Sequence, residues 1–212
     1  MPSKQYHKKE TSNEVSLIFV EGDTDEIFYK KTFNELVGNF PRKTFNLKGN
    51  HNLFRKIADK TAVFINIDKK AKVRVYCCID RESRYDDPPL DLNFLRETFY
   101  SEITFNKRIL SADTIIATQM IESWFFHDIE GIFNFLRVPH RDRNPDKYKP
   151  IEKFTDKDLS RLFFYYKKIY IKGKRCENFV EHLDLSKIYN ECEELQQGID
   201  LIKSRFKGEG SS

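Results

Sequence analysis

The 212-residue sequence predicts an α/β fold, in which helices cover both faces of a mainly parallel sheet and a helical extension follows. Three observations lead to this prediction. Short apolar runs alternate with segments of helical periodicity through the first half of the chain, and two of these runs end in an acidic residue, Glu21 and Asp80. The second half begins with a basic stretch that contains prolines and continues with helical patterns.

The first unit is a strand, a tight turn and a helix. Residues 15–21 form an apolar run that ends in Glu-Gly, and residues 23–37 carry apolar side chains at helical spacing. Asp23 and Glu26 have the spacing of a capping box, which predicts that the helix begins directly after the turn. Gly38 predicts the end of this helix.

The next three segments continue the alternation. We expect a short strand at 44–47, a helix at 52–67 and a buried strand at 72–80. This βαβαβ order indicates a parallel sheet, and in such sheets functional groups gather beyond the carboxyl ends of the strands.

The remaining segments are mostly helical by the same criteria. They are a helix at 90–100 after a polar loop at 81–89, an extended stretch at 109–116, a helix at 118–136, a loop with three prolines at 139–150, and helices at 156–170, 177–183 and 185–206. We therefore divide the chain into a polar amino-terminal segment (1–14), an α/β domain (15–136) and a basic loop with a helical extension (137–212).

Composition excludes several classes of protein. Hydrophobic residues make up 39% of the chain and aromatic residues 14%, which is ample for a packed core and argues against disorder. No apolar stretch approaches the roughly 20 residues of a membrane span, and the first residues lack the apolar centre of a signal peptide. The four cysteines show no CxxC spacing, which argues against a zinc site or a disulfide framework. We expect a cytoplasmic protein with no membrane partner.

The charge is unevenly distributed. Residues 137–175 contain 13 Lys and Arg against 5 Asp and Glu, whereas residues 176–212 contain 4 against 8. Aromatic residues at 163–166 and 170 interrupt the basic stretch, a pattern that suits a surface on which nucleic-acid bases stack. A solvated helix with an aromatic core face is the alternative interpretation.

Acidic residues at strand ends suggest a metal site. Glu21 and Asp80 each end an apolar strand, so a parallel sheet would place both at one edge. Glu82 lies two residues after Asp80 and would face the same side if the chain stayed extended. Converging carboxylates repel one another unless a cation neutralises them, and oxygen ligands suit Mg²⁺ or Mn²⁺.

Two of these segments resemble the motifs of the Toprim family. Residues 17–29 read LIFVEGDTDEIFY and resemble the first motif, a strand that ends in Glu-Gly before an acidic residue opens a helix. Residues 75–82 read VYCCIDRE and resemble the second, a strand that ends in Asp-x-Asp, as in topoisomerases, primases and overcoming-lysogenization-defect nucleases. Glu82 replaces the second Asp, which keeps the charge but lengthens the arm. The resemblance implies a Toprim, Rossmann-like sheet.

A third segment is similar to a helix of the stand-alone Toprim proteins of phage-defence systems, such as the PARIS effector subunit. Residues 118–126 read TQMIESWFF, and the likeness implies that Glu122 approaches the metal. The cluster at 172–175 (KGKR) resembles a lysine-bearing stretch near the end of such proteins, which makes Lys174 a candidate for stabilising charge in the transition state.

The resemblance thus implies a metal-dependent endonuclease that hydrolyses phosphodiester bonds as the toxic effector of an anti-phage, abortive-infection system. RNA, especially tRNA, is favoured over DNA as substrate. The catalytic candidates are Glu21, Asp80, Glu82 and Lys174, and the candidate ligands of Mg²⁺ or Mn²⁺ are Glu21, Asp25, Asp80, Glu82 and Glu122. Because the chain has no P-loop, a separate ATPase partner subunit is expected, and the carboxyl-terminal helices are candidates for homodimerisation.

Plainer interpretations remain open for several residues. Helix capping and the helix dipole account for Asp23 and Asp25 without a metal. Glu122 suits the solvated face of a helix. For the whole protein, the alternative is a catalytically inactive Toprim module that binds nucleic acid or regulates a partner. A dinucleotide-binding enzyme is disfavoured, because no GxGxxG follows the first strand.

Overall fold

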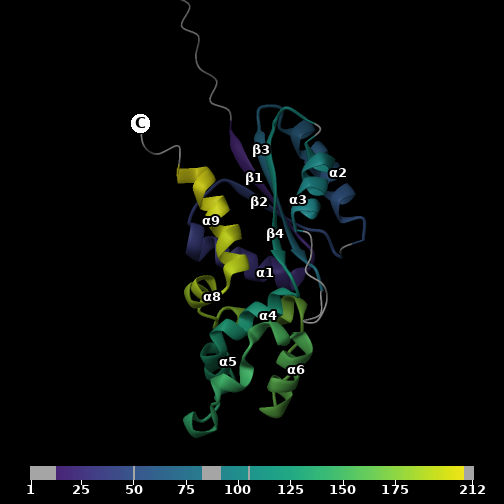
Figure 1. Ribbon diagram of the computed structural model, residues 1–212. Helices are drawn as coiled ribbons and strands as arrows, with labels where there is room; N and C mark the ends of the chain where they lie inside the picture. Colours follow the sequence, from purple (N-terminus) through teal and green to yellow (C-terminus); the bar gives the residue numbers. More distant parts are fainter. Residues whose placement is uncertain (1–12, 50, 83–91, 105, 208–212) are drawn as a thin grey trace, which may run out of the picture.

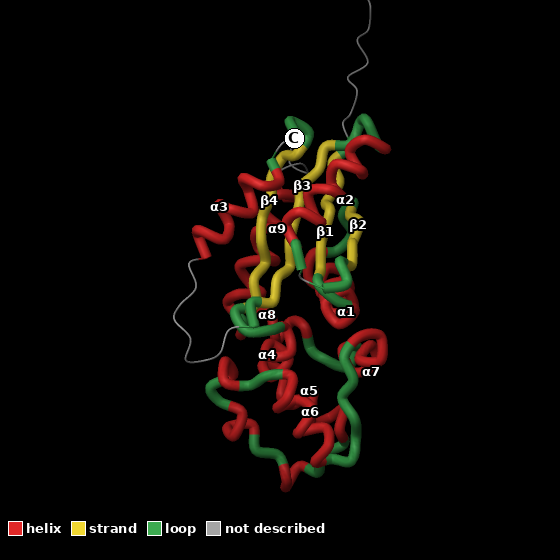
Figure 2. Tube along the Cα trace, turned by 90° about the vertical axis from the view of Figure 1, so that its right-hand side faces the viewer, coloured by secondary structure: helices red, strands yellow, loops and turns green. Residues whose placement is uncertain are grey.

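A four-stranded parallel sheet forms the centre of the computed structural model, which describes residues 13–49, 51–82, 92–104 and 106–207 (Figure 1). The strands are β1 (Glu14–Val20), β2 (Arg42–Asn46), β3 (Lys72–Asp80) and β4 (Ile109–Ala117). They lie in the order β2-β1-β3-β4, and every neighbouring pair is parallel (Figure 2). The predicted α/β class with a parallel sheet is confirmed.

Strand register aligns the carboxyl ends of the two central strands. Phe19 pairs with Cys77 across β1 and β3, and Asp80 pairs with Ala117 across β3 and β4. The residues that directly follow β1 therefore lie beside the end of β3. This edge of the sheet faces the helical lower part of the molecule in Figure 1.

Alternating side chains divide the core into two layers. Ile18 and Val20 pack in one hydrophobic cluster, whereas Leu17 and Phe19 pack in another on the opposite face of the sheet. Helices α2 (Leu53–Ile67) and α3 (Leu92–Ile103) cover the second face, and α1 (Asp23–Thr32) and α9 (Glu193–Lys207) cover the first (Figures 1 and 2). A π-helical turn (Phe33–Val37) extends α1 to Gly38, where the predicted end is confirmed with a φ of 88°.

The prediction of a single helix at 118–136 is wrong, because the chain forms two helices there. Helix α4 (Ile121–Phe125) and helix α5 (Ile129–Leu136) are separated by a 3-10 turn. The Asp128 side chain accepts a hydrogen bond from the Gly131 N–H at 3.1 Å and starts α5 anew.

Three further predicted helices, at 156–170, 177–183 and 185–206, are shorter than expected or divided. Helix α6 (Asp156–Tyr165) ends early because Lys167 adopts a left-handed backbone with a φ of 57°. The segment 185–206 is divided at Cys192 into α8 (Leu185–Glu191) and α9, because Cys192 has an extended backbone. The short α7 (Glu177–Val180) precedes them, and the predicted loop at 139–150 contains two 3-10 turns, His140–Asp142 and Pro145–Tyr148.

The residues after 136 pack directly against the sheet and its first helix. The Lys31 ammonium group is buried and donates to the carbonyls of Val180, Glu181 and Leu183 at 3.1, 3.0 and 2.6 Å. Helix α9 lies against β4 at Gly198, where an added Cβ would be 2.6 Å from Ile115. Close packing of this kind requires glycine.

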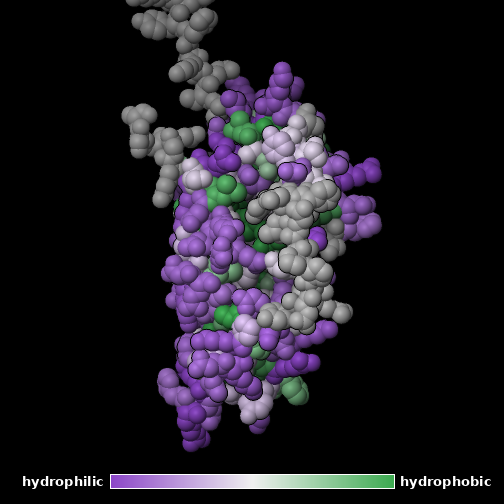
Figure 3. All heavy atoms as spheres, viewed as in Figure 1, coloured by the Kyte–Doolittle hydropathy of each residue, from purple (hydrophilic) through white to green (hydrophobic). Residues whose placement is uncertain are grey.

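Some predictions fall outside the described residues. These are most of the polar amino-terminal segment, most of the loop at 81–89, the start of the helix at 90–100 and the residues after Lys207. No helix in the described part of the chain is long and apolar enough to cross a membrane. On the face drawn in Figure 3 the described surface is mainly hydrophilic, and hydrophobic side chains form small separate patches.

Candidate functional site

Glu21 and Asp80 meet at the carboxyl edge of the sheet. Glu21 directly follows β1, and its Oε1 accepts a hydrogen bond from the Asp80 N–H at 3.1 Å. Asp80 is the last residue of β3, and its Oδ1 accepts from the N–H of Ile121, the first residue of α4, at 3.2 Å. The two strand ends and the start of α4 are therefore joined through carboxylates.

Two more carboxylates are buried at the same edge. Asp25 lies in the first turn of α1 and is 8% exposed, while Glu122 lies in the first turn of α4 and is 2% exposed. The interpretation of Glu122 as part of a solvated helix face is therefore wrong. The amino-terminal ends of both helices carry positive partial charge, which favours acidic side chains there.

Burial and mutual repulsion shift the pKa values of these groups. Burial raises the pKa of Asp25 to about 7, and the carboxylates of Glu122 and Glu21 add to this effect. Burial also raises the pKa of Asp80 well above its usual range, with further contributions from Asp25, Glu122 and Glu21. Glu21, Asp25, Asp80 and Glu122 thus form one electrostatic unit, which we call the carboxylate cluster.

Glu21 is influenced by groups on both sides of the cluster. Burial raises its pKa, the Asp80 N–H lowers it, the Glu82 carboxylate raises it and the Arg81 guanidinium lowers it. Glu82 is therefore within electrostatic reach of the cluster.

Glu82 reaches this position by a different route from the predicted one. Its backbone is left-handed, with a φ of 52°, and its N–H donates to the Gln119 carbonyl at 2.6 Å. The expectation of an extended chain from Asp80 to Glu82 is therefore wrong, because β3 ends at Asp80, but Glu82 still lies on the same side as Glu21 and Asp80, since the three line one cavity. The Glu82 side chain is exposed.

Lys172 brings a positive charge to the cluster. Its Nζ lies 3.2 Å from Glu122 Oε1 and 3.1 Å from Asp156 Oδ2. The Tyr170 hydroxyl also donates to Glu122 Oε1, at 3.2 Å. Burial lowers the pKa of Lys172, but the two carboxylates outweigh this effect and raise the pKa overall. The lysine that contacts the cluster is thus Lys172, whereas the resemblance pointed to Lys174 within the basic KGKR stretch.

Lys174 lies instead near Asp23, beside the cluster. Asp23 does not form the predicted capping box, because Gly22 is the N-cap of α1 and no side chain caps it. The Asp23 carboxylate accepts a hydrogen bond from Asn46 Nδ2 at 2.7 Å and is paired with Lys48. The Lys48 hydrogen bond is the main cause of a lowered pKa at Asp23, and Lys174 contributes a smaller part.

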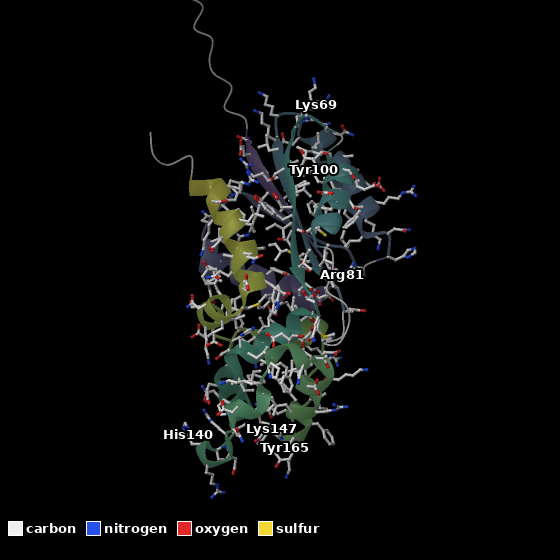
Figure 4. The ribbon with its side chains drawn as sticks, viewed as in Figure 1. Lys69, Arg81, Tyr100, His140, Lys147 and Tyr165 are labelled. Atoms are coloured by element: carbon white, nitrogen blue, oxygen red, sulfur yellow. The ribbon has the colours of Figure 1, made fainter. Side chains whose placement is uncertain are left out.

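A cavity of about 520 Å³ opens onto the cluster from the side of α2 and α3. Glu21, Asp80 and Glu82 line it together with Arg55 and Arg81. Figure 4 places Arg81 between the sheet and the helical lower part of the molecule. Acidic groups with two nearby guanidinium groups suit a phosphate ester that is held beside a cation. Arg81 lies within the Toprim-like motif, whereas nothing in the sequence pointed to Arg55.

The chemistry of the cluster fits a hard divalent cation. All donors are carboxylate oxygens. Burial is the main cause of the raised pKa values of Asp25, Asp80 and Glu21, and neighbouring carboxylates, whose charge a cation would neutralise, add to it. Among the residues that the structure describes, no three His, Cys, Asp or Glu side chains stand at ligand distances. Each member of the cluster accepts hydrogen bonds within the protein: Glu21, Asp80 and Asp25 from backbone N–H groups, and Glu122 from the Tyr170 hydroxyl.

The fold and this site define an α/β protein with a carboxylate cluster beyond the carboxyl edge of a parallel sheet. The chain belongs to the family described as a domain of unknown function, DUF4276, which matches residues 20–201. The matched range contains the whole cluster and Lys172. No curated protein and no solved structure matches the chain.

Proposed function

We propose that this protein is a metal-dependent nuclease of the Toprim type, which hydrolyses phosphodiester bonds at the carboxylate cluster. The observation that carries the proposal is the burial of Asp25 and Glu122 beside Glu21 and Asp80. Burying several like charges together is costly, and such an arrangement is typical of sites that bind a cation or move protons.

The proposed ligands of Mg²⁺ or Mn²⁺ are the four cluster residues, with Glu82 as a further ligand from the cavity. The metal supplies Lewis acidity, which activates water and neutralises charge on the phosphate. Arg55 and Arg81 would bind phosphate groups of the substrate in the cavity. We transfer the charge-stabilising role expected of Lys174 to Lys172, because Lys172 contacts Glu122 while Lys174 lies beside Asp23.

The biological setting follows from the resemblance to phage-defence proteins. We propose a cytoplasmic toxic effector of abortive infection, with RNA, especially tRNA, favoured over DNA as substrate. A separate ATPase subunit would hold or release this effector, and the effector would form a homodimer. The basic segment 137–175 supports a nucleic-acid substrate, since phosphate contacts dominate such binding.

Cleavage by the purified chain tests the enzymatic proposal. Labelled tRNA, single-stranded DNA and plasmid are incubated with Mg²⁺, Mn²⁺ or chelator, with and without a candidate ATPase partner. We compare the wild type with Glu21→Gln and with Asp59→Asn, which neutralises an exposed carboxylate on α2 as a control. The proposal expects metal-dependent cleavage that Glu21→Gln loses and Asp59→Asn retains. Equal cleavage by both variants would contradict it.

A non-catalytic nucleic-acid-binding or regulatory module is the second candidate. One observation favours it: Lys172, Tyr170 and backbone N–H groups already provide partners for three of the cluster carboxylates without a metal. Such a module would bind nucleic acid equally well in the wild type and in Glu21→Gln, with or without chelator, and would cleave nothing.

A further inference from the structure

A second cavity, of about 550 Å³, lies in the helical region away from the carboxylate cluster. It opens between the 3-10 turn Pro145–Tyr148 and α6, near the lower end of the molecule, where Figure 4 labels Lys147 and Tyr165. Its volume is within the range of about 300–1,000 Å³ that is usual for small-ligand sites. The apolar part of its lining comes from Phe133, Phe154 and Leu162.

Three tyrosines form the aromatic part of the lining: Tyr148, Tyr165 and Tyr166. Tyr148 is fixed by ring stacking on Phe126, with ring centroids 5.8 Å apart. Tyr165 is 77% exposed, and its ring meets Tyr166 edge-on at a centroid distance of 4.9 Å. A broad face of the Tyr165 ring is therefore accessible to a planar ligand.

Polar groups around the cavity suit the edges of a nucleobase. Arg161 and Lys147 supply hydrogen-bond donors, and Asp142, Asn144 and Asp158 supply acceptors. Arg161 Nη1 already donates to Asp158 Oδ1 at 3.1 Å, and its other N–H groups can donate to a base. The whole stretch 137–175 has an excess of 8 basic over acidic residues, from 13 Lys and Arg against 5 Asp and Glu. Aromatic rings beside basic side chains are typical of sites that bind single-stranded nucleic acid.

A short segment of chain connects this cavity to the carboxylate cluster. Helix α6 ends at Tyr165, and the chain then runs from Tyr166 to Lys172, which contacts Glu122. Six residue steps span at most about 20 Å when fully extended. A nucleic-acid strand of a few nucleotides therefore has the length to occupy the cavity and the cluster at once.

We propose that this cavity binds one unstacked base of a single-stranded nucleic acid, with the base against the Tyr165 ring and the strand leading to the carboxylate cluster. The inference deepens the proposed function, on which it rests, by naming the form of the substrate. It predicts a preference for loops and single strands over duplexes, because paired bases are not available for stacking on protein.

Binding of fluorescent oligonucleotides to the full chain in chelator tests the proposal without any need for cleavage. Tyr165→Ala removes the accessible ring, Tyr165→Phe keeps it, and Phe164→Ala is the matched control. Phe164 is 80% exposed on the same helix but does not line the cavity. Because both side chains are mostly exposed, truncating either one should leave the fold intact.

We expect Tyr165→Ala to weaken binding of single-stranded RNA or DNA roughly tenfold or more, as for the loss of one stacked base. Tyr165→Phe and Phe164→Ala should bind like the wild type, and comparison of the RNA and DNA oligonucleotides identifies the sugar. Equal losses at Tyr165 and Phe164, wild-type binding by Tyr165→Ala, or a duplex that binds as well as single strands would overturn the proposal. A chain that binds single strands through Tyr165 but never cleaves them would contradict the nuclease proposal alone.

Discussion

The carboxylate cluster and Asp128 are two buried acidic sites with opposite surroundings. Asp128 is 3% exposed, and its carboxylate accepts hydrogen bonds from the N–H groups of Gly131 and Asp184, at 3.1 and 2.8 Å. Lys187 lies 3.8 Å away. In the cluster, by contrast, Asp25 and Asp80 have other carboxylates as their main charged neighbours. A buried carboxylate with hydrogen-bond donors and a lysine around it, such as Asp128, stabilises the fold. Buried carboxylates that lie beside one another, as in the cluster, suggest a site for a ligand.

The largest expected difference between the two sites is in activity. Asp80→Asn should lower cleavage by about a hundredfold or more, because it removes a charge proposed to hold the metal. Asp128→Asn should leave the cleavage rate per folded molecule unchanged. Initial rates of metal-dependent cleavage of the best substrate measure both. Similar rates for the two variants would remove the functional distinction.

The second expected difference is in stability: substitution should destabilise the protein at Asp128 and stabilise it at Asp25. Asp128→Ala leaves buried N–H groups without an acceptor and removes the cap of α5, which should cost about 1–3 kcal/mol of unfolding free energy. Asp25→Asn should instead stabilise the chain at pH 8 in chelator, because it removes repulsion within the cluster. Urea unfolding of both variants checks the signs. Destabilisation by Asp25→Asn would show that its charge is balanced in the folded protein.

The pH dependence of stability sharpens the same contrast. The folded-state pKa of Asp25 is about 7, above the 3.8 of a free aspartate, so the folded chain holds a proton that the unfolded chain releases between these values. This contribution to stability is present at low pH and is lost as the pH rises through about 7. In chelator the melting temperature should therefore fall between pH 5.5 and pH 8.5.

Metal and mutation provide the controls for this effect. Mg²⁺ or Mn²⁺ should raise the melting temperature more at pH 8.5 than at pH 5.5, because the cation binds the ionised carboxylates. Asp25→Asn should show a smaller fall with pH and a smaller response to metal. A wild-type melting temperature that rises with pH in chelator would mean that protonation of the cluster does not determine stability between pH 5.5 and pH 8.5.

The smallest expected effect separates two neighbouring lysines. Lys172→Ala should lower the turnover rate roughly tenfold, because it removes a positive charge beside Glu122. Lys174→Ala, two residues away, should change it much less. The ratio of the two turnover rates, measured with saturating substrate, tests the assignment. A larger loss of turnover rate in Lys174→Ala would return the charge-stabilising role to Lys174, as the Toprim resemblance first suggested.

Local pattern predicted the sheet and the strand-end acids, but not the contacts made by distant segments. Glu21 and Asp80 were predictable because each ends an apolar strand and parallel strands end together. The burial of Glu122 depends on α4, which α6 and the later helices enclose, and helical spacing alone does not reveal such packing. Lys172 faces Glu122 because a 3-10 turn begins after it at Gly173. The sequence KGKR alone does not predict where this turn begins.

The position of Lys31 has a consequence for the synthesis of the chain. This lysine leaves the ribosome early, in the first helix, yet its three carbonyl acceptors belong to residues 180–183. Until residues 180–183 have left the ribosome, the ammonium group has to remain in water, and α1 cannot pack on the sheet in its final position. The two halves of the chain must therefore fold together, so the carboxylate cluster is completed only when nearly the whole protein has been synthesised.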